Sequence, residues 1–488
     1  MGFKPIILWT DGLLALLLLA GLTYGWAVKH REHLRTPWQR VIRNRSGLVS
    51  ILILSVFLFV GLVDSLHFRP ELKSSKGREK AYAVEVLSLL DVLLAPLRLH
   101  TEKTYSAPLA ARLFSKETVE MPDGRQTRIF PRLLYGGAHL QEPEREKNGD
   151  IVKRTFWGLL TAVVIWGMLA FFFLILLARR SQERLSVKAR SLFRGKEEVP
   201  WQAALWTLLV LLLFGIPIAF LSIKYHVLGT DKVGQDVLFL ALKSIRTGLI
   251  IGTLTTLVML PFAVLLGIMA GYFRGWVDDA IQYIYTTLNS IPAVLLIAAA
   301  VLMTQVFMDR HVDWFETVSA RADFRLLFLC LILGVTSWTG LCRLLRGEAL
   351  KLREMEYIQA AQALGVSEFR IILRHILPNV MHIILIAVVM DFSGLVLAEA
   401  VLSYVGVGVD PSMISFGTMI NSARMEMARE PMVWWSLAAA FGFMFLLVLS
   451  ANLFSDTVRD AFDPRIQTRS IRLLFRRQAL LEKKEDRP

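Results

Sequence analysis

Long apolar runs alternate with polar, mostly basic segments along most of this 488-residue chain. A run of about 18 or more apolar residues is long enough to cross a lipid bilayer as a helix. The pattern therefore predicts an all-α, polytopic membrane protein with about nine spanning helices. The predicted spans are Ile6–Val28, Gly47–Asp64, Phe156–Ala178, Trp201–Ile223, Ile245–Tyr272, Ile281–Val306, Leu326–Leu345, Val380–Val401 and Trp434–Leu453.

The distribution of basic residues predicts how these spans are oriented. Lysines and arginines cluster at 29–45 and at 179–196, directly after the first and third runs. By the positive-inside rule both clusters are cytoplasmic, so we expect the N-terminus outside and the C-terminus inside. No small-residue cleavage site precedes the first cluster, which favours a spanning helix over a signal peptide. Asp11, near the outer end of the first run, is expected to be an interfacial residue.

Composition supports a membrane location. Hydrophobic residues make up 55% of the chain and charged residues 20%, with a mean hydropathy of +0.50. A soluble protein of this length would carry more charge. The net charge of +14 fits basic loops facing anionic lipid, so nucleic acid is not an expected partner. Cys330 and Cys342 are about three helical turns apart and cannot form a disulfide within one helix.

The chain divides into segments of different character. The long polar stretch 65–154 is expected to be a folded extracytoplasmic insert, because its apolar residues are too frequent for a disordered tail. Within it, Val84–Leu97 is typical of an amphipathic helix and Met121–Arg125 of a hairpin turn. The expected units are 1–46 (extra helix and basic loop), 47–64 (span), 65–154 (insert), 155–225 (two spans), 226–465 (core) and 466–488 (basic tail).

The segment Arg353–Pro378 interrupts the apolar pattern between two spans and predicts a pair of short helices. Glu354–Leu364 contains good helix formers, and Gly365 can end that helix in a left-handed conformation. Ser367 can cap a second helix, Glu368–Ile376, which Pro378 would end. One face of the first helix carries Tyr357, Ala360, Ala361 and Leu364. From the residues alone, an ordinary loop between helices is an equal alternative.

Two stretches carry a resemblance to a known family. The stretch EYIQAAQALGVSEFRIILRHILPN resembles the EAA motif of the membrane subunits of ABC importers, in its peptide-importer form. Ala360, Ala361, Gly365, Leu377 and Pro378 match, whereas Gln359 replaces the usual Glu and His375 a frequent Ile. The stretch HVLGTDKVGQDV, from His226 to Val237, resembles the outer-face segment HPLGTDxxGRDV of the same permeases. Val227 replaces its Pro, and Gln235 replaces its Arg.

The chain thus resembles a C-type permease subunit of an oligopeptide/dipeptide/nickel-type ABC importer. The resemblance implies a type I importer core at 226–465 in a bacterial inner membrane, and either Gly47–Asp64 or Trp201–Ile223 could supply its first helix. It implies a homologous second permease, two ATPase subunits, a substrate-binding protein and membrane lipid as partners. It further implies a cytoplasmic coupling helix that docks on an ATPase. The docking residues would be Glu354, Tyr357, Gln359, Ala360, Ala361, Leu364, Gly365, Ser367, Leu377 and Pro378.

Catalytic motifs are absent from the sequence. It has no G-x-x-x-x-G-K-[ST] phosphate loop and no HExxH, CxxC or GxSxG, so we expect neither an enzyme nor a metal site. ATP and Mg²⁺ would bind to the partner ATPases, and no cofactor is expected in this chain. The outer motif residues are His226, Gly229, Thr230, Asp231, Gly234 and Asp236. In the family they mark the outer face. The residue types by themselves predict a Gly/Asp turn that leads into a helix, with Asp231 or Asp236 as its cap.

Two acids lie inside the predicted span Val380–Val401. Asp391 and Glu399 are within roughly 80° of each other around a helix axis, and a carboxylate at membrane depth faces protein or water. They could line a translocation path, or they could be paired within the bundle, which we favour for Glu399. A secondary transporter driven by an ion gradient is the alternative function, but no internal repeat is visible. A third possible function is that of a scaffold, whose extra helices and insert bind a partner.

Overall fold

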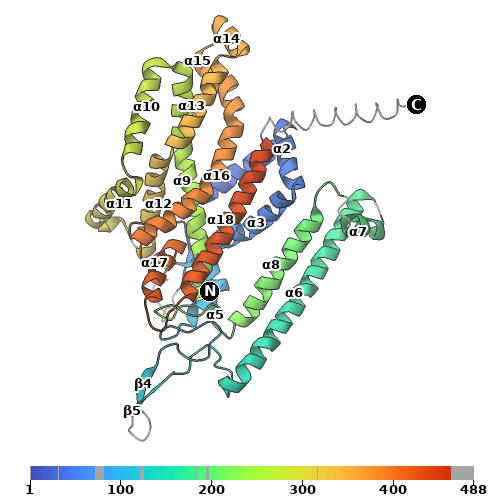
Figure 1. Ribbon diagram of the computed structural model, residues 1–488, viewed down its shortest axis with the longest axis vertical. Helices are drawn as coiled ribbons and strands as arrows, with labels where there is room; N and C mark the ends of the chain where they lie inside the picture. Colours follow the sequence, from blue (N-terminus) through green and yellow to red (C-terminus); the bar gives the residue numbers. More distant parts are fainter. Residues whose placement is uncertain are drawn as a thin grey trace.

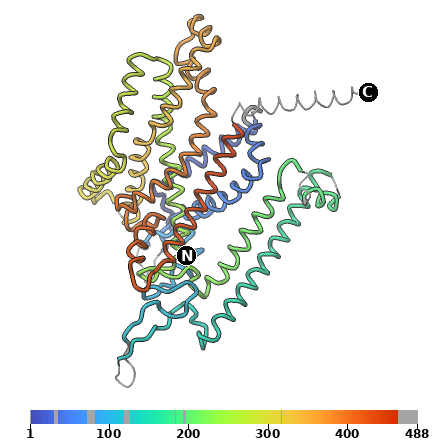
Figure 2. The backbone as a smooth tube through the Cα atoms, in the orientation of Figure 1, coloured from blue at the N-terminus to red at the C-terminus, as the bar shows by residue number. Residues whose placement is uncertain are grey.

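The computed structural model describes residues 2–30, 32–71, 82–120, 126–182, 184–193, 197–315 and 317–462. Within these ranges, nine helical stretches are long and apolar enough to cross a membrane, which confirms the expected number. The turn predicted at 121–125 and the basic tail 466–488 lie outside the described residues. Figures 1 and 2 show a main bundle, a two-helix hairpin that leans away from it, and a small extramembrane region at one end.

The main bundle is built around one long helix. Its members are α1 (Trp9–His30), α3 (Arg45–Asp64), α9 (Val237–Phe273), α11 (Ala293–Arg310), α12 (Val318–Ser337), α13 (Thr339–Arg353), α16 (Leu377–Val405) and α18 (Trp435–Phe462). Helix α9 packs against α3, α12, α13, α16 and α18. Glycines on α9 let α13 pack closely against it. A Cβ on Gly271 of α9 would lie 2.5 Å from the backbone oxygen of Arg346 on α13. The same helices bury Cys330 and Cys342, both as free thiols.

Helices α6 (Pro143–Ser181) and α8 (Trp201–Ser222) form the leaning hairpin, joined through α7 (Leu185–Phe193). They pack tightly, since a Cβ on Gly158 would lie 2.7 Å from the Cα of Pro217. The indole of Trp166 donates a hydrogen bond to the Leu205 carbonyl at 2.8 Å. Helix α8 touches the bundle through α3, whereas α3 itself packs on α9 and α18. Of the two candidates for the first core helix, α3 is therefore the one that packs directly on the central helix α9.

The span predicted over Ile281–Val306 is wrong as a continuous helix. The structure has α10 (Gly275–Ser290) and α11, separated by Ile291 and Pro292. Ile291 is extended, with φ −90° and ψ 129°, which is the conformation favoured before a proline. Proline also supplies no backbone N–H to continue the ladder, so the chain restarts as a second helix.

Pro378 does not end the second short helix, contrary to the prediction. Helix α15 (Glu368–Ile371) continues through a π-helical turn, Ile372–Ile376, into α16. Pro378 is the second residue of α16, directly after the π-helical turn, and such a local change of helix type accommodates the missing backbone N–H of a proline. The side-chain amide of Asn379 donates to the His375 carbonyl at 2.6 Å. The segment Glu368–Val405 is thus one stretch of 38 helical residues.

The insert forms a small mixed layer at one end of the bundle. Strands β1 (Phe3–Ile6), β2 (His67–Pro70) and β3 (Leu87–Ser88) make an antiparallel sheet in that order, so Ile6 belongs to a strand and not to the first span. Two short helices, α4 (Leu89–Leu93) and α5 (Ala95–Leu99), replace the single helix predicted at 84–97. Strands β4 (Glu117–Glu120) and β5 (Gln126–Ile129) pair as the arms of a hairpin that projects from the body (Figure 1).

Candidate functional site

The segment that resembles a coupling helix is α14 (Glu356–Ala363), which lies at the end of the bundle opposite the insert (Figure 1). It ends as the sequence predicts, with Gly365 at φ +73°. The N–H of Val366 donates to the Ala361 carbonyl at 3.1 Å, and that of Gly365 to the Gln362 carbonyl at 2.9 Å. These two bonds make a complete Schellman motif. Ser367 is at the N-cap of α15, but its side chain makes no capping hydrogen bond.

One face of α14 is seated on the bundle. Ile358 is fully buried and Ala361 is 9% exposed, both in a cluster with residues of α9, α13 and α16. Gln362 donates to the Tyr272 hydroxyl at 3.1 Å, and Arg353 donates to the Tyr272 carbonyl at 2.7 Å. Ala361 therefore helps to hold α14 on the bundle. The sequence analysis placed it on one face with Tyr357, Ala360 and Leu364, but unlike them it is not exposed to a partner.

The opposite face of α14 and the following elbow are exposed. Leu364 is 83% exposed and Tyr357 is 43% exposed, with Ala360 between them on the same side. Phe369, at 72% exposure, adds a residue that the sequence prediction missed. The signal for it was an aromatic side chain next to two charged residues in the second predicted short helix. Together these side chains form an apolar patch at the end of the bundle that bears α14. Such an exposed patch is typical of a protein interaction surface.

The remaining predicted coupling residues lie close by. Glu354 forms an ion pair with Arg274, which connects the end of α13 to the loop between α9 and α10. Gln359 is exposed and donates to the Glu354 carbonyl at 3.3 Å. Pro378 is exposed and Leu377 is half-buried at the start of α16. The structure thus gathers all the predicted coupling residues at one end of the molecule.

The outer motif, at the other end of the molecule, holds the insert to the bundle through a buried ion cluster. His226 lies between two acids, with Nδ1 2.7 Å from Asp236 Oδ2 and Nε2 3.5 Å from Glu102 Oε1. Glu102 comes from the insert and also accepts hydrogen bonds from three backbone N–H groups at 134–136. All three side chains are 5% exposed or less.

Burial and hydrogen bonding act in opposite directions on this cluster. Burial lowers the pKa of His226, but the hydrogen bond to Asp236 and the nearby carboxylate of Glu102 outweigh it and raise the pKa to about 9. Burial raises the pKa of Glu102, but the nearby imidazole of His226 and the hydrogen bonds from three backbone N–H groups outweigh it and lower the pKa to about 2. At neutral pH the cluster therefore holds a charged imidazolium between carboxylates.

The glycines and Thr230 of the motif make the close contacts to the insert. A Cβ on Gly234, where φ is +77°, would lie 1.8 Å from the Glu102 backbone oxygen. A Cβ on Gly229 would lie 2.5 Å from the Ser106 backbone oxygen. Thr230 Oγ1 accepts from the Ser106 N–H at 2.6 Å, and its carbonyl accepts from the Trp435 indole at 3.0 Å. The motif therefore fixes the insert to the start of α18.

The two aspartates of the motif have the turn and cap roles that the sequence predicts. Asp236 accepts from the N–H groups of Leu238 and Phe239 and caps α9. Asp231 accepts from the N–H groups of Val233 and Gln235 within the turn. The motif is thus a structural clamp between the insert and the bundle.

The two acids of α16 differ in their surroundings. Glu399 is 1% exposed and accepts hydrogen bonds from Ser403 (2.7 Å) and Ser415 (2.8 Å). Its partners are therefore within the chain, which agrees with the favoured prediction that Glu399 is paired within the bundle. Ser415 caps α17 (Phe416–Met427), which follows α16. Asp391 is half-buried, and its carboxylate makes no hydrogen bond or ion pair within the described ranges. Of the two, Asp391 alone remains a candidate for the translocation path.

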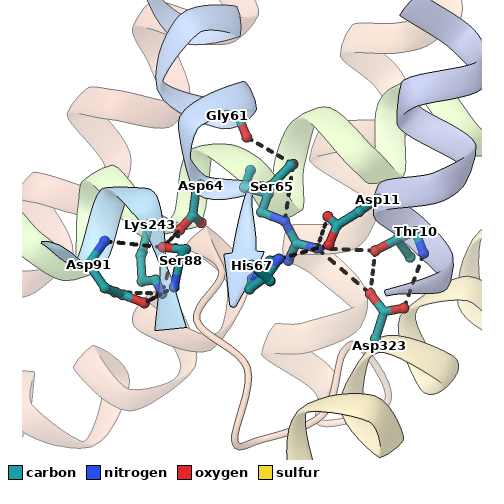
Figure 3. A network of polar contacts seen from close by, with 11 residues as sticks. Thr10, Asp11, Gly61, Asp64, Ser65, His67, Ser88, Asp91, Lys243 and Asp323 are labelled. Atoms are coloured by element: carbon teal, nitrogen blue, oxygen red, sulfur yellow. Dashed lines mark hydrogen bonds and ion pairs between the residues drawn. The ribbon is translucent and has the colours of Figure 1, made fainter. Parts of the chain in front are cut away.

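A charge network that the sequence analysis missed joins α1 to the main bundle (Figure 3). Arg246 of α9 donates to Asp11 of α1 at 2.6 Å and lies 3.8 Å from Asp323 of α12. Asp11 is also 2.7 Å from His67 of β2, and Thr10 bonds Asp323 through both its N–H and its hydroxyl. Asp11 is 7% exposed, so within the first turn of α1 it is buried against protein, a contact that its prediction as an interfacial residue did not include.

A second part of the network lies one helical turn away on α9. Lys243 contacts Asp91 of α4 at 2.7 Å and Asp64 of α3 at 3.5 Å, and Ser88 donates to Asp64 at 2.6 Å (Figure 3). Burial raises the pKa of Asp91, but its contacts with Lys243 outweigh it and lower the pKa. A cavity of about 190 Å³ lies beside both cations. The extra helix and the insert are thus tied to α9 by charge.

Comparison with known proteins identifies the core. The family described as "Binding-protein-dependent transport system inner membrane component" matches residues 263–468, from within α9 through α18. The oligopeptide transport system permease protein OppC of Mycobacterium tuberculosis (strain ATCC 25618 / H37Rv) is 32% identical over 247 residues, which is 51% of this chain and 78% of that protein. The chain belongs to this family of transport permeases.

Other relatives agree with that assignment. The glutathione transport system permease protein GsiD of Pectobacterium atrosepticum is 32% identical over 245 residues, covering 50% of this chain and 74% of that protein. A solved inward-facing MetNI methionine ABC transporter covers 46% of this chain at 16% identity, with a TM-score of 0.34. That structural likeness is too weak to support an argument.

Family membership makes the chain a multi-pass inner-membrane permease of an ABC importer. It excludes the alternative of a secondary transporter driven by an ion gradient. The matched residues begin within α9, so α1 to α8 and the insert lie before the family's matched region.

Proposed function

We propose that this chain forms half of the translocation path for peptides or similar small solutes in an ATP-driven importer. The named relatives, which include oligopeptide, dipeptide and glutathione permeases, support this solute class. ATP and Mg²⁺ bind to the partner ATPase subunits and not to this chain.

The observation that carries the proposal is the exposed apolar patch of Tyr357, Leu364 and Phe369 on and beside α14. An ATPase subunit docks on this patch. The elbow after α14 leads into the continuous helical stretch Glu368–Val405, so movement of the docked subunit reaches the depth of the membrane through one rigid element. The free-energy difference between the inward-open and outward-open states then resides in this docking interface.

The complete importer contains a homologous second permease, two ATPase subunits and an extracytoplasmic substrate-binding protein. The end of the bundle that bears α14 is cytoplasmic, and the end that bears the insert is extracytoplasmic, with the N-terminus outside and the C-terminus inside. The basic flanks at 29–45 and 179–196 support this orientation.

Asp391 faces the path between the two permeases. Its half-buried carboxylate makes no ion pair in the part of the chain that the structure describes, and a carboxylate at membrane depth needs protein or water beside it. A water-filled path meets that need, and the carboxylate attracts the amino terminus of a peptide.

Uptake of labelled peptides into vesicles tests the proposal. Inside-out and right-side-out vesicles are compared to find the side on which ATP is required. The importer is purified with its co-purifying subunits and reconstituted with the binding protein and labelled peptides. We expect uptake that requires ATP on the side bearing α14 and persists when the proton gradient is collapsed. Uptake that survives ATP removal would contradict the proposal, and ATP-dependent uptake of a non-peptide solute alone would correct its solute class.

A further inference from the structure

A cavity of about 380 Å³ separates the leaning hairpin from the main bundle. It lies where α3 and α8 both begin, next to the end of α2 (Glu32–Arg43), and therefore at one surface of the membrane. Figure 2 shows the hairpin standing beside the bundle on this side. The lining comes from both bodies and includes Arg43, Arg45, Glu197, Glu198, Trp201 and Trp206.

The polar wall of this cavity has cationic side chains available to a ligand. Arg45 makes no ion pair within the ranges that the structure describes. Arg43 is 2.5 Å from Glu198, but the two side chains are 50% and 79% exposed, and such exposed pairs contribute little stability. Glu197 is neutralised separately by Lys188 at 2.8 Å. One guanidinium is thus free, and the other is only weakly held.

The other wall is apolar and aromatic. Trp201 packs edge-on against Phe173 of α6 with ring centroids 5.0 Å apart, which fixes its position. Trp206 stands one and a half turns further along α8 and is 53% exposed. Tryptophan side chains at a membrane surface lie at headgroup level, with an apolar body directed toward acyl chains. The cavity is therefore amphipathic, with cations at one end and indole rings beside them.

We propose that an anionic phospholipid of this leaflet occupies the cavity, with its phosphate on Arg43 and Arg45 and its acyl chains along Trp206. A guanidinium binds a phosphate through two parallel hydrogen bonds. Because the exposed Arg43–Glu198 pair contributes little stability, Arg43 can exchange it for the phosphate at small cost. The lipid then connects the hairpin to the bundle at the end where the exposed Arg43–Glu198 pair also joins them.

Native mass spectrometry of the full-length protein, titrated with phosphatidylglycerol or phosphatidylcholine in a neutral detergent, tests this site. The test variant combines Arg43→Gln with Arg45→Gln. The matched control is Arg190→Gln, because Arg190 is an exposed arginine on α7 that does not line the cavity. Thermal melting of each variant checks that the fold is intact.

We expect phosphatidylglycerol binding to weaken roughly fivefold for each arginine removed, with the control unchanged. Trp206→Ala is expected to weaken it further, because the acyl chains lose their contact. Equal losses in Arg190→Gln, or phosphatidylcholine binding as tight as phosphatidylglycerol, would overturn the proposal. If millimolar inorganic phosphate displaces the lipid and Trp206→Ala has no effect, the cavity is a simple anion site and the lipid assignment is wrong.

Discussion

The guanidinium of Arg246 donates a 2.6 Å hydrogen bond to the carboxylate of Asp11, across 235 residues of sequence. Arg246 belongs to the central helix of the permease bundle, whereas Asp11 belongs to an extra helix that precedes the residues matched by the family. Both side chains are less than 10% exposed. The extra helix is therefore part of the permease's insert-bearing end and not a separable anchor.

Removal of Arg246 should be strongly destabilising. In Arg246→Met, Asp11 and Asp323 remain buried without their cation, and removal of one partner from a buried ion pair typically costs about 3–5 kcal/mol. Unfolding in mixed micelles, followed by circular dichroism, measures the loss. Combining Arg246→Met with Asp11→Leu should recover part of it, because one of the two uncompensated carboxylates is then gone.

Arg321→Met is the matched control for this prediction. Arg321 pairs with Asp309, but the two side chains are 39% and 54% exposed, and such a pair contributes about 0–1 kcal/mol. An Arg246→Met protein as stable as this control would show that the network does not stabilise the protein.

The clamp formed by Glu102, His226 and Asp236 should weaken at alkaline pH. The pKa of His226 is raised from 6.5 to about 9, so its contribution to stability is complete below about pH 6.5 and is lost as the pH rises through about 9. Limited proteolysis of the insert across pH 6 to 10 measures this. His226→Gln should be cleaved rapidly at every pH, and an insert whose cleavage rate has the same pH dependence in both proteins would contradict the assignment.

Gly234→Ala should detach the insert from the bundle. The added Cβ would lie 1.8 Å from the Glu102 backbone oxygen, and the left-handed φ of +77° alone costs an alanine about 1–2 kcal/mol. Faster proteolysis within 65–154 is the expected readout. Gly149→Ala in α6 is the control, because nothing lies within 4 Å of its added Cβ and alanine favours a helix.

The sequence was most informative where structure is local. Apolar run length located the spans, and the Gly365 turn followed from its own residue type. It was least informative where distant segments meet. Pro378 reads as a helix stop but begins α16, because a π-helical turn upstream carries the helix into it. The insert is held by contacts such as Glu102 with His226, which no local pattern encodes.

The network at Arg246 had a signal that could have been used. Arg246 lies inside the predicted span Ile245–Tyr272, and a charge there requires a partner. Asp11, in another predicted span, is such a partner, but choosing it from sequence requires knowing which helices are neighbours. Ala361 shows the same limit, because helical spacing groups it with Tyr357 while packing decides which side is buried.

The two adjacent alanines of α14 should respond differently to arginine. Ala361→Arg forces a charge into the buried seat, so it should lower the protein's thermal stability as well as its transport. Ala360→Arg lies on the exposed side, so it should leave stability unchanged and impair only coupling. Melting temperature and ATP-dependent uptake, measured for both variants, separate the two effects. Equal destabilisation by both would contradict the seating of α14.

Co-purification of the ATPase subunits with Leu364→Glu tests the central claim most directly. Leu364 is 83% exposed, so the substitution leaves the fold intact while it places a charge in the docking patch. Val187→Glu on α7, where Val187 is 55% exposed, is the matched apolar-to-acid control. We predict that the control retains the ATPase subunits and that Leu364→Glu loses them at the same level of membrane insertion. Full recovery of the ATPase subunits with Leu364→Glu and Phe369→Glu would contradict the assignment of α14 as the coupling helix.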